Sequence, residues 1–411
     1  MTDLTSNIAA DIRAPLSRLA SSRRMPFLTR HLQRLLSQVS YGDITVVLPN
    51  GNVLHRQAPS PGPSAKLVIR RWRAVWRLLA GGENGFVDAF IAGDWWTPNL
   101  VTFLAFGACN DTGMQHAISG SLAQRLLVRL RHWRNRNTRQ GSRRNIAAHY
   151  DLGNAFYALW LDRSMQYSSA LFMTNDQTLE TAQDNKLAHV LDLLDIRGGE
   201  CVLEIGCGWG ALMERLMPRC QVTGVTLSAE QLRFTRERIA GAPGAEARLQ
   251  DYRDITDKFD RVVSIEMIEA VGEKYWPAYF ETLRNALAPG GTVLLQAITI
   301  DETRFEKYRQ QPDFIQRYIF PGGVLPTVDI IRRQAARAGL ELTLHEPFGE
   351  SYALTLADWR ERFLAAWPEI ERLGFDDSFK RMWEYYLCYC EAGFQNGAIN
   401  VGYFKFKAVK P

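Results

Sequence analysis

The stretch VLEIGCGWG at residues 202–210 constrains the fold of this chain more than any other segment. An apolar, strand-like run is followed by Gly206, Gly208 and Gly210, and then by ALMERL, which has helical spacing. Glycine lets the backbone turn sharply and lets a ligand approach closely, because no side chain stands in the way. The pattern therefore predicts a strand, a tight loop and a helix, with a ligand at the loop.

Further apolar runs repeat this alternation along the chain. Segments with helical spacing separate four strand candidates, at residues 201–206, 220–227, 259–266 and 290–299. Such alternation indicates an α/β fold, with a parallel sheet and crossover helices.

The length of 411 residues exceeds what one hydrophobic core usually fills, so we expect more than one domain. Upstream of the alternating region, residues 43–57 predict two strands around an Asn50–Gly51 turn, and residues 58–65 a loop. The resulting division is a small mixed α+β domain at 1–120, a basic linker at 121–144 and an α/β catalytic domain at 145–411.

The linker is the most strongly charged part of a chain whose net charge is +5. Residues 125–144 contain eight arginines and no acid. One interpretation is a solvated linker. The other is a basic amphipathic helix on anionic lipid headgroups, since Leu122, Leu126, Leu130 and Trp133 recur at helical spacing. Nucleic acid is not an expected partner, because no motif that reads RNA or DNA accompanies the charge.

Targeting signals and metal motifs are not apparent. The N-terminal residues form no continuous apolar stretch and no run approaches the roughly 20 apolar residues of a spanning helix, so we expect a cytoplasmic protein, associated peripherally with the inner face of the membrane. The six cysteines have no paired spacing, which predicts reduced thiols and no metal site.

The glycine loop also indicates a class of ligand. Its GxGxG spacing differs from the GxGxxG of dinucleotide enzymes, and Glu204 precedes Gly206 by two residues. A carboxylate there suits a ligand with positive charge, such as the sulfonium and amino groups of S-adenosylmethionine. The alternative is a tight turn that packs a helix on a strand without a ligand.

Several motifs together resemble the cyclopropane-fatty-acyl-phospholipid synthase family of S-adenosylmethionine-dependent methyltransferases. They are AAHYDLGNAFYALWLDRSMQYSSALF, VLEIGCGWGALMERL, VTGVTLSAEQL, LQDYRDITDKFDRVVSIEMIEAVG, RYIFPGGVLPT and CEAGFQNGAINVGYFKFK. The segment GGENGFVDAFIAGDWW resembles the lipid-associated N-terminal domain of longer members, and EMIEAVG and LLQAITI resemble the plant-type branch. The resemblance implies a Rossmann-like class I methyltransferase domain at 145–411.

The resemblance implies which residues bind S-adenosylmethionine. They lie in a segment that covers the cofactor, in the glycine loop, after the second strand and beside the adenine. In chain order they are Tyr150, Tyr167, Ser168, Glu204, Gly206, Gly208, Trp209, Thr226, Leu227, Gln231, Asp251 and Tyr252.

For catalysis, the family uses a bound bicarbonate as the base, and the resemblance implies bicarbonate as a second ligand here. Glu269 and Tyr352 match the family's glutamate and tyrosine. Ser169 stands where many members have cysteine, and Gln296 where many have histidine. Glu266 occupies a position that is glycine in many bacterial synthases, and an added carboxylate beside a bound anion is unfavourable unless it is protonated or faces water.

Three functions remain open at this point. We expect a synthase that transfers a methylene from S-adenosylmethionine to the double bond of an unsaturated membrane phospholipid and leaves a cyclopropane. A C-methyltransferase on the same lipids, giving methyl-branched or methylated unsaturated chains, is the first alternative. A non-catalytic lipid-binding protein is the second, although the presence of Glu204, Glu269 and Tyr352 argues against it. A homodimer is an open alternative for the assembly.

Overall fold

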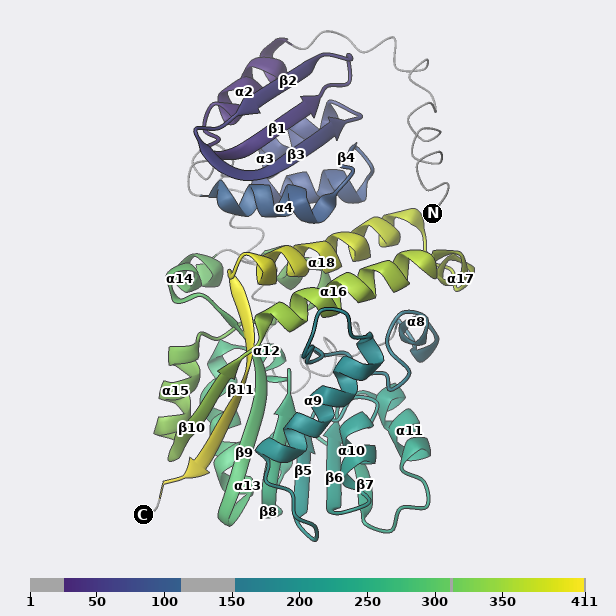
Figure 1. The fold of residues 1–411 in the computed structure, drawn as a ribbon, viewed down its shortest axis with the longest axis vertical. Helices are drawn as coiled ribbons and strands as arrows, with labels where there is room; N and C mark the ends of the chain where they lie inside the picture. Colours follow the sequence, from purple (N-terminus) through teal and green to yellow (C-terminus); the bar gives the residue numbers. More distant parts are fainter. Residues whose placement is uncertain (1–25, 112–151, 311–312, 410–411) are drawn as a thin grey trace. The chain divides into compact units, whose positions relative to one another are not determined.

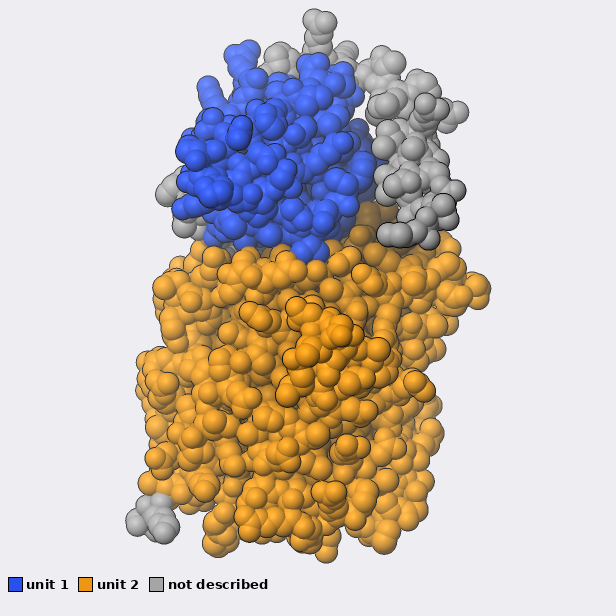
Figure 2. Space-filling model, viewed as in Figure 1, with its two compact units in different colours: residues 1–124 blue, residues 125–411 orange. Residues whose placement is uncertain are grey.

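The computed structural model describes residues 26–111, 152–310 and 313–409. Contacts between Cα atoms divide the chain into two compact units, residues 1–124 and 125–411 (Figure 2). The linker predicted at 121–144 lies outside the described residues, so its boundaries and its membrane contact stay predictions. Within the described ranges, no helix combines the length and the apolar composition needed to cross a bilayer.

The first unit is the small mixed α+β unit that the sequence predicts. Its four-stranded sheet has the order β2-β1-β3-β4. The strands are β1 (Tyr41–Val47), β2 (Val53–Gln57), β3 (Ser60–Ile69) and β4 (Trp95–Trp96), and the helices are α2 (Pro26–Leu36), α3 (Arg73–Ile91) and α4 (Leu100–Cys109).

The predicted strand pair at 43–57 is present, but the loop predicted at 58–65 is wrong. β1 and β2 pair in antiparallel register around Gly51, whose φ is +83°. β3 already begins at Ser60 and runs parallel to β1 across an irregularity near Gly42. A Cβ atom on Gly62 would lie 2.7 Å from the Gly42 nitrogen. The two glycines thus let the backbones approach closely, and pairing with β1 overrides the turn preference of the prolines.

The second unit is built on a seven-stranded sheet of order β10-β11-β9-β8-β5-β6-β7 (Figure 1). The strands are β5 (Cys201–Ile205), β6 (Gln221–Thr226), β7 (Ala245–Leu249), β8 (Phe259–Ile265), β9 (Leu287–Ile300), β10 (Leu340–Pro347) and β11 (Ile399–Ala408). Four of them, β5, β6, β8 and β9, are the predicted strand candidates, and with β7 they form the predicted parallel sheet. β11 runs antiparallel between β9 and β10, which the sequence did not predict.

Helices cover both faces of this sheet. One hydrophobic cluster joins the strands to α13 (Trp276–Ala286) and α15 (Val328–Arg337). A second joins them to α9 (Leu179–Leu193), α10 (Ala211–Leu216) and α11 (Ala229–Arg238). The other helical segments are α8 (Asn154–Ala158), α12 (Ile268–Val271), α14 (Glu302–Gln310), α16 (Gly349–Ala365), α17 (Trp367–Arg372) and α18 (Asp377–Gln395), with 3₁₀ turns at Tyr252–Asp254 and Glu273–Tyr275 and a π-helical turn at Ile315–Ile319. In Figure 1, α16 and α18 pack along each other beyond the carboxyl ends of the parallel strands.

The glycine loop is fastened to β6. The backbone nitrogens of Gly206 and Cys207 donate hydrogen bonds of 2.9 and 3.1 Å to the Val225 carbonyl oxygen. Gly224, which precedes Val225, is buried under this loop, where a Cβ atom would lie 2.3 Å from Met213 Sδ and 2.9 Å from Cys207 Cβ.

We expect Gly224→Ala to destabilise the second unit by about 1–3 kcal/mol, because overpacking a filled core costs that much. Thermal unfolding followed by circular dichroism should show a melting temperature lower by several degrees. Gly199→Ala is the control without steric overlap, because a Cβ atom there meets nothing within 4 Å. Its φ of +92° still adds backbone strain. A Gly224→Ala variant as stable as the wild type would show that Met213 moves aside freely.

Candidate functional site

The glycine loop and Glu204 form the floor of the candidate site, at the carboxyl end of β5. Gly206, Gly208 and Gly210 all have positive φ, of +81°, +53° and +82°, which explains the need for glycine. A Cβ atom on Gly208 would meet nothing within 4 Å, so this side of the loop is open. Trp209 is buried, and its Nε1 donates to Asn154 Oδ1 at 2.8 Å. The loop thus offers backbone to a ligand on one side and packs on the other.

Glu204 is 4% exposed, and in the part of the chain that the structure describes its Oε2 atom has no hydrogen-bond partner. Burial raises the pKa of this carboxyl to about 8, while the nearby charge of Lys186 lowers it. An unpartnered, buried acid beside an open glycine loop fits a ligand with a positive group, which would favour the ionised form.

Residues predicted for the ribose region lie together at the end of β6. Thr226 donates from Oγ1 to Gln231 Oε1 at 3.0 Å, and Ser228 caps α11 by accepting from the Gln231 nitrogen. Leu227, between them, is partly exposed. The structure therefore brings Thr226, Leu227 and Gln231 to the sheet edge that carries the glycine loop.

The residues predicted beside the adenine follow β7. Asp251 is buried and forms a bidentate ion pair with Arg253, at 2.8 and 2.6 Å. The ring of Tyr252 packs edge-on against Tyr279, with centroids 5.5 Å apart, and belongs to the hydrophobic core. Contact with adenine stays a prediction for both Asp251 and Tyr252.

The segment before α9 brings Tyr167, Ser168 and Ser169 to the site. The hydroxyl groups of Tyr167 and Tyr386 share a hydrogen bond of 2.8 Å, which ties this segment to α18. Ser168 Oγ accepts a hydrogen bond of 2.8 Å from the Lys186 ammonium. Tyr150, which was predicted with this segment, lies outside the described residues.

Glu266 is the centre of the predicted catalytic residues. Its Oε1 atom accepts from the Ser169 nitrogen at 2.8 Å and from Gln296 Nε2 at 2.7 Å. Its Oε2 atom accepts from the Tyr352 hydroxyl at 2.7 Å. We call these three donors, together with the carboxylate they bind, the Glu266 cradle. It joins four of the five residues predicted to be catalytic.

The Glu266 cradle disagrees with the bicarbonate that the resemblance implies. Ser169, Gln296 and Tyr352 were the expected donors to a free anion, but all three bind the Glu266 side chain. Ser169 stands where many family members have cysteine, but its hydroxyl donates to the Ala170 carbonyl oxygen at 2.9 Å. The residues present therefore do not fit bicarbonate, because a carboxylate of the chain itself takes the place of the anion.

Glu266 adopts this position at some backbone strain. Its φ of +48° lies in the left-handed region, which residues other than glycine seldom adopt. Strain of this kind persists where surrounding contacts fix it, and it is common at functional sites. The carboxylate is therefore held by its three donors against the preference of its backbone.

Glu269, one turn further on in α12, is a second acid of different character. Its Oε1 atom accepts from the Ile298 nitrogen at 2.5 Å, whereas its buried Oε2 atom has no hydrogen-bond partner among the described residues. Burial and the neighbouring charge of Glu266 raise the pKa of Glu269 to about 8. Burial also raises the pKa of Glu266, but the hydrogen bonds from Tyr352, Ser169 and Gln296 oppose that rise. The two carboxyls thus differ in their hydrogen bonds: three donors favour the ionised form of Glu266, whereas one, the Ile298 nitrogen, favours that of Glu269.

Aromatic rings enclose the site on the side of α16 and α18. Tyr167 lies against Trp359, with ring centroids 5.3 Å apart, and Tyr352 stacks on Phe394 at 4.4 Å. Trp359 also lies against Tyr352 of the Glu266 cradle, and the faces of such rings attract positive charge. Trp383, Tyr385 and Tyr386 of α18 are buried as well.

Sequence reasoning missed Lys186 and Tyr386, which contact the predicted residues Ser168 and Tyr167. The position of the lysine in the sequence could have indicated its burial. Lys186 falls on the mostly apolar face of α9, between Leu179 and Val190, where helical spacing predicts a core residue.

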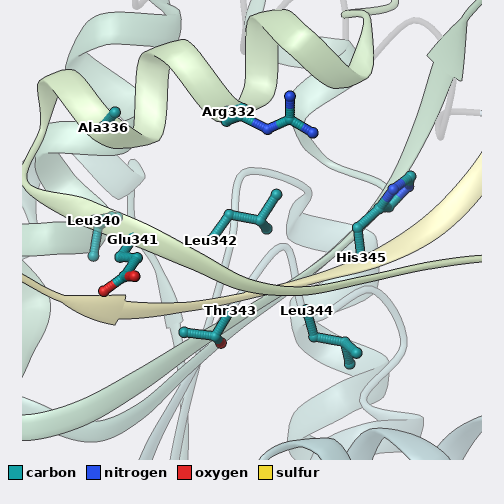
Figure 3. A pocket seen from close by; sticks show the side chains of 8 residues that line it. All are labelled: Arg332, Ala336, Leu340, Glu341, Leu342, Thr343, Leu344 and His345. Carbon is teal, nitrogen blue, oxygen red and sulfur yellow. The ribbon is translucent and has the colours of Figure 1, made fainter.

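A hollow of about 400 Å³ lies elsewhere on the second unit, between α15 and β10 (Figure 3). Its lining includes Arg332 and His345 and none of the predicted site residues. It is separate from the Glu266 cradle, and we assign no role to it.

The parallel sheet with one antiparallel strand next to its edge, and the glycine loop at the carboxyl end of β5, define a class I methyltransferase fold. The chain belongs to the mycolic acid cyclopropane synthetase family, whose model matches residues 137–404.

Individual relatives cover most of the chain. The tuberculostearic acid methyltransferase UfaA1 of Mycobacterium tuberculosis is 38% identical over 95% of this chain and 92% of its own length. The cyclopropane-fatty-acyl-phospholipid synthase of Escherichia coli is 37% identical over 78% of this chain and 81% of its own length. Among solved structures, the mycolic acid cyclopropane synthase CmaA1 complexed with SAH and CTAB is 30% identical, with a TM-score of 0.61 over 64% of this chain and 97% of that one.

Proposed function

We propose that this protein is an S-adenosylmethionine-dependent methyltransferase that methylates the double bond of an unsaturated acyl chain in a membrane phospholipid. The Glu266 cradle carries the proposal, because three hydrogen bonds fix a carboxylate in an aromatic-lined site near the glycine loop. Family membership supports the reaction class, and the relative CmaA1 is a mycolic acid cyclopropane synthase complexed with SAH.

The residues present fit S-adenosylmethionine. Glu204 offers an unpartnered carboxylate to a cationic group, and Gly208 leaves room for close approach. When bound, the cofactor supplies an electrophilic methyl group. Thr226 and Gln231 fix the end of β6 beside it through their own hydrogen bond.

The residues of this protein act on the positive charge that methyl transfer leaves on the acyl chain. An alkene that takes up a methyl cation becomes a carbocation and must lose a proton to become neutral. Glu266 is the proton acceptor in this proposal, because its oxygens accept three hydrogen bonds, which hold the carboxylate in place and favour its ionised form. The rings of Tyr167, Tyr352 and Trp359 pack against one another beside it, and aromatic faces stabilise positive charge.

The position of the proton that leaves decides the product. If a chain carbon next to the cation loses it, a methylated alkene forms; if the new methyl group loses it, a cyclopropane closes. We propose the methylated alkene as the product. Glu266 is tethered to the chain and cannot follow the transferred methyl group as a free anion can. A relative named as a methyltransferase of tuberculostearic acid also matches 95% of the chain.

The cyclopropane that the sequence analysis favoured is the second candidate. A cyclopropane-fatty-acyl-phospholipid synthase is 37% identical over 78% of the chain, which supports it. Docking on anionic membranes through residues 125–144 is part of the proposal for either product, and it rests on the sequence alone.

Proton NMR of lipids from cells that express the protein distinguishes the two products. We expect olefinic signals together with an added methyl group, and no upfield ring hydrogens. Mass alone does not decide, because both products gain the same CH₂. Cells that express Glu266→Gln at the same level are the control. Ring signals would establish the cyclopropane instead, and unchanged lipids together with no cofactor binding would leave the lipid-binding alternative.

A further inference from the structure

Lys186 is a charged residue on the buried face of α9. That face consists of Leu179, Ala182, Gln183, Lys186, Leu187 and Val190. The side chain of Lys186 is 2% exposed. An ammonium group taken out of water is unfavourable unless other groups compensate for the lost hydration, so its retention in this position calls for a specific reason.

The Lys186 ammonium is surrounded by acids but bound to none of them. Its one hydrogen bond to a described residue goes to Ser168 Oγ, at 2.8 Å, although an ammonium carries three donors. Glu204, Glu266 and Asp162 all act on it electrostatically and favour its charged form, whereas burial lowers its pKa to about 8. Lys186 therefore holds a positive charge beside the site, and two of its three N–H donors have no partner among the described residues.

Two of these three acids are already satisfied by other donors. Glu266 is bound in its cradle, and Asp162 accepts from the backbone nitrogens of Ser164 and Gln166 at 2.7 and 3.1 Å. Glu204 has no such partner on its Oε2 atom. The unsatisfied charges are thus one cation and one anion, Lys186 and Glu204, on neighbouring elements α9 and β5.

Lys186 also determines how Ser168 can bind a ligand. A hydroxyl group that accepts from an ammonium must direct its own hydrogen elsewhere, so Ser168 acts as a donor. Gln183, one turn before Lys186, donates from Nε2 to the Ser168 carbonyl oxygen at 3.1 Å and fixes the backbone of this serine. A donor with a positive charge behind it selects an anionic acceptor.

We propose that Lys186 is a positioning residue that acts through Ser168 to bind the carboxylate of the cofactor's amino-acid part, while Glu204 faces its ammonium group. The two opposite charges match the zwitterionic end of S-adenosylmethionine. This inference rests on the proposed function, since it names how the same site recognises its cofactor.

Binding of two ligands, measured by titration calorimetry on the full chain without lipid, tests the proposal. S-adenosylmethionine and decarboxylated S-adenosylmethionine differ only in the carboxylate. We expect the wild type to bind the first at least tenfold more tightly. Lys186→Met, which keeps the length but removes the charge, should reduce this preference about tenfold, the order that a charged hydrogen bond contributes. Binding of the decarboxylated ligand should stay within about twofold.

Gln183→Met is the matched control for packing, because it removes a neutral hydrogen bond to the same serine from the same helix face. It removes no charge, so it should reduce the preference for S-adenosylmethionine much less than Lys186→Met does. Ser168→Ala provides a second variant should Lys186→Met fail to fold, and it should reduce the same preference. Equal losses for both ligands in Lys186→Met, or an unchanged preference, would overturn the role of Lys186. A wild type that binds neither ligand would instead overturn the proposed function.

Discussion

Replacing Glu266 with glycine is expected to lower turnover by about 10²–10⁴, the usual contribution of a positioned general base. The backbone should tolerate the change well, because glycine adopts the φ of +48° without the strain that glutamate has there. The donors of the Glu266 cradle, from Ser169, Gln296 and Tyr352, would then have no carboxylate to bind. Added bicarbonate or formate should therefore restore part of the activity of Glu266→Gly.

This prediction is measured as methyl transfer from labelled cofactor to phospholipid vesicles, in buffer freed of bicarbonate and after its addition. The wild type should be indifferent to the anion, since its own carboxylate fills the cradle. Glu266→Gln should be inactive and should not respond, because its amide occupies the same space without a basic oxygen. A wild type that requires bicarbonate, or a Glu266→Gly variant that is fully active without any anion, would exclude Glu266 as the base.

The sequence was informative where one local pattern determines the structure. The glycines of residues 206–210 need positive φ at a strand end, and their spacing predicted the loop. The alternation of strand and helix candidates predicted the parallel sheet. β11 could not be predicted in the same way. Its position between β9 and β10 depends on pairing with strands far away in the chain, such as Tyr403 with Gln296, and no local pattern specifies that register.

The role of Glu266 could not be predicted from a local pattern either, because it also depends on contacts between distant parts of the chain. The sequence identified Glu266 as a departure from the family pattern, but not as the group that the other residues bind. Its partners Ser169 and Tyr352 lie 97 and 86 residues away, and only the folded chain brings their hydrogen-bond donors to one carboxylate. The contact between Lys186 and Ser168 was closer in sequence, 18 residues apart, and the lysine's place on a buried helix face could have indicated it.

Glu269→Gln is expected to bind the cofactor about as well as the wild type and to lose turnover by about 10²–10³, as removal of one preorganised electrostatic group does. The carboxyl of Glu269 has a pKa of about 8, so a fraction of it is already ionised near neutral pH, and its unpartnered Oε2 atom can then face positive charge that develops beside it. Glutamine has the shape of the neutral acid but cannot ionise, so it fails only when the cation forms.

The pH dependence of this variant separates an electrostatic role from a structural one. Glu269 has a pKa of about 8, so its ionised fraction rises between pH 7 and 9, and the wild type's turnover should rise over this range relative to that of Glu269→Gln. Glu204 and Lys186 also titrate with pKa values of about 8, but both are present in the two proteins, and their effects cancel in the ratio. A constant ratio across this range, or unchanged turnover of Glu269→Gln at saturating cofactor, would refute the role of Glu269 as the group that ionises toward the cation.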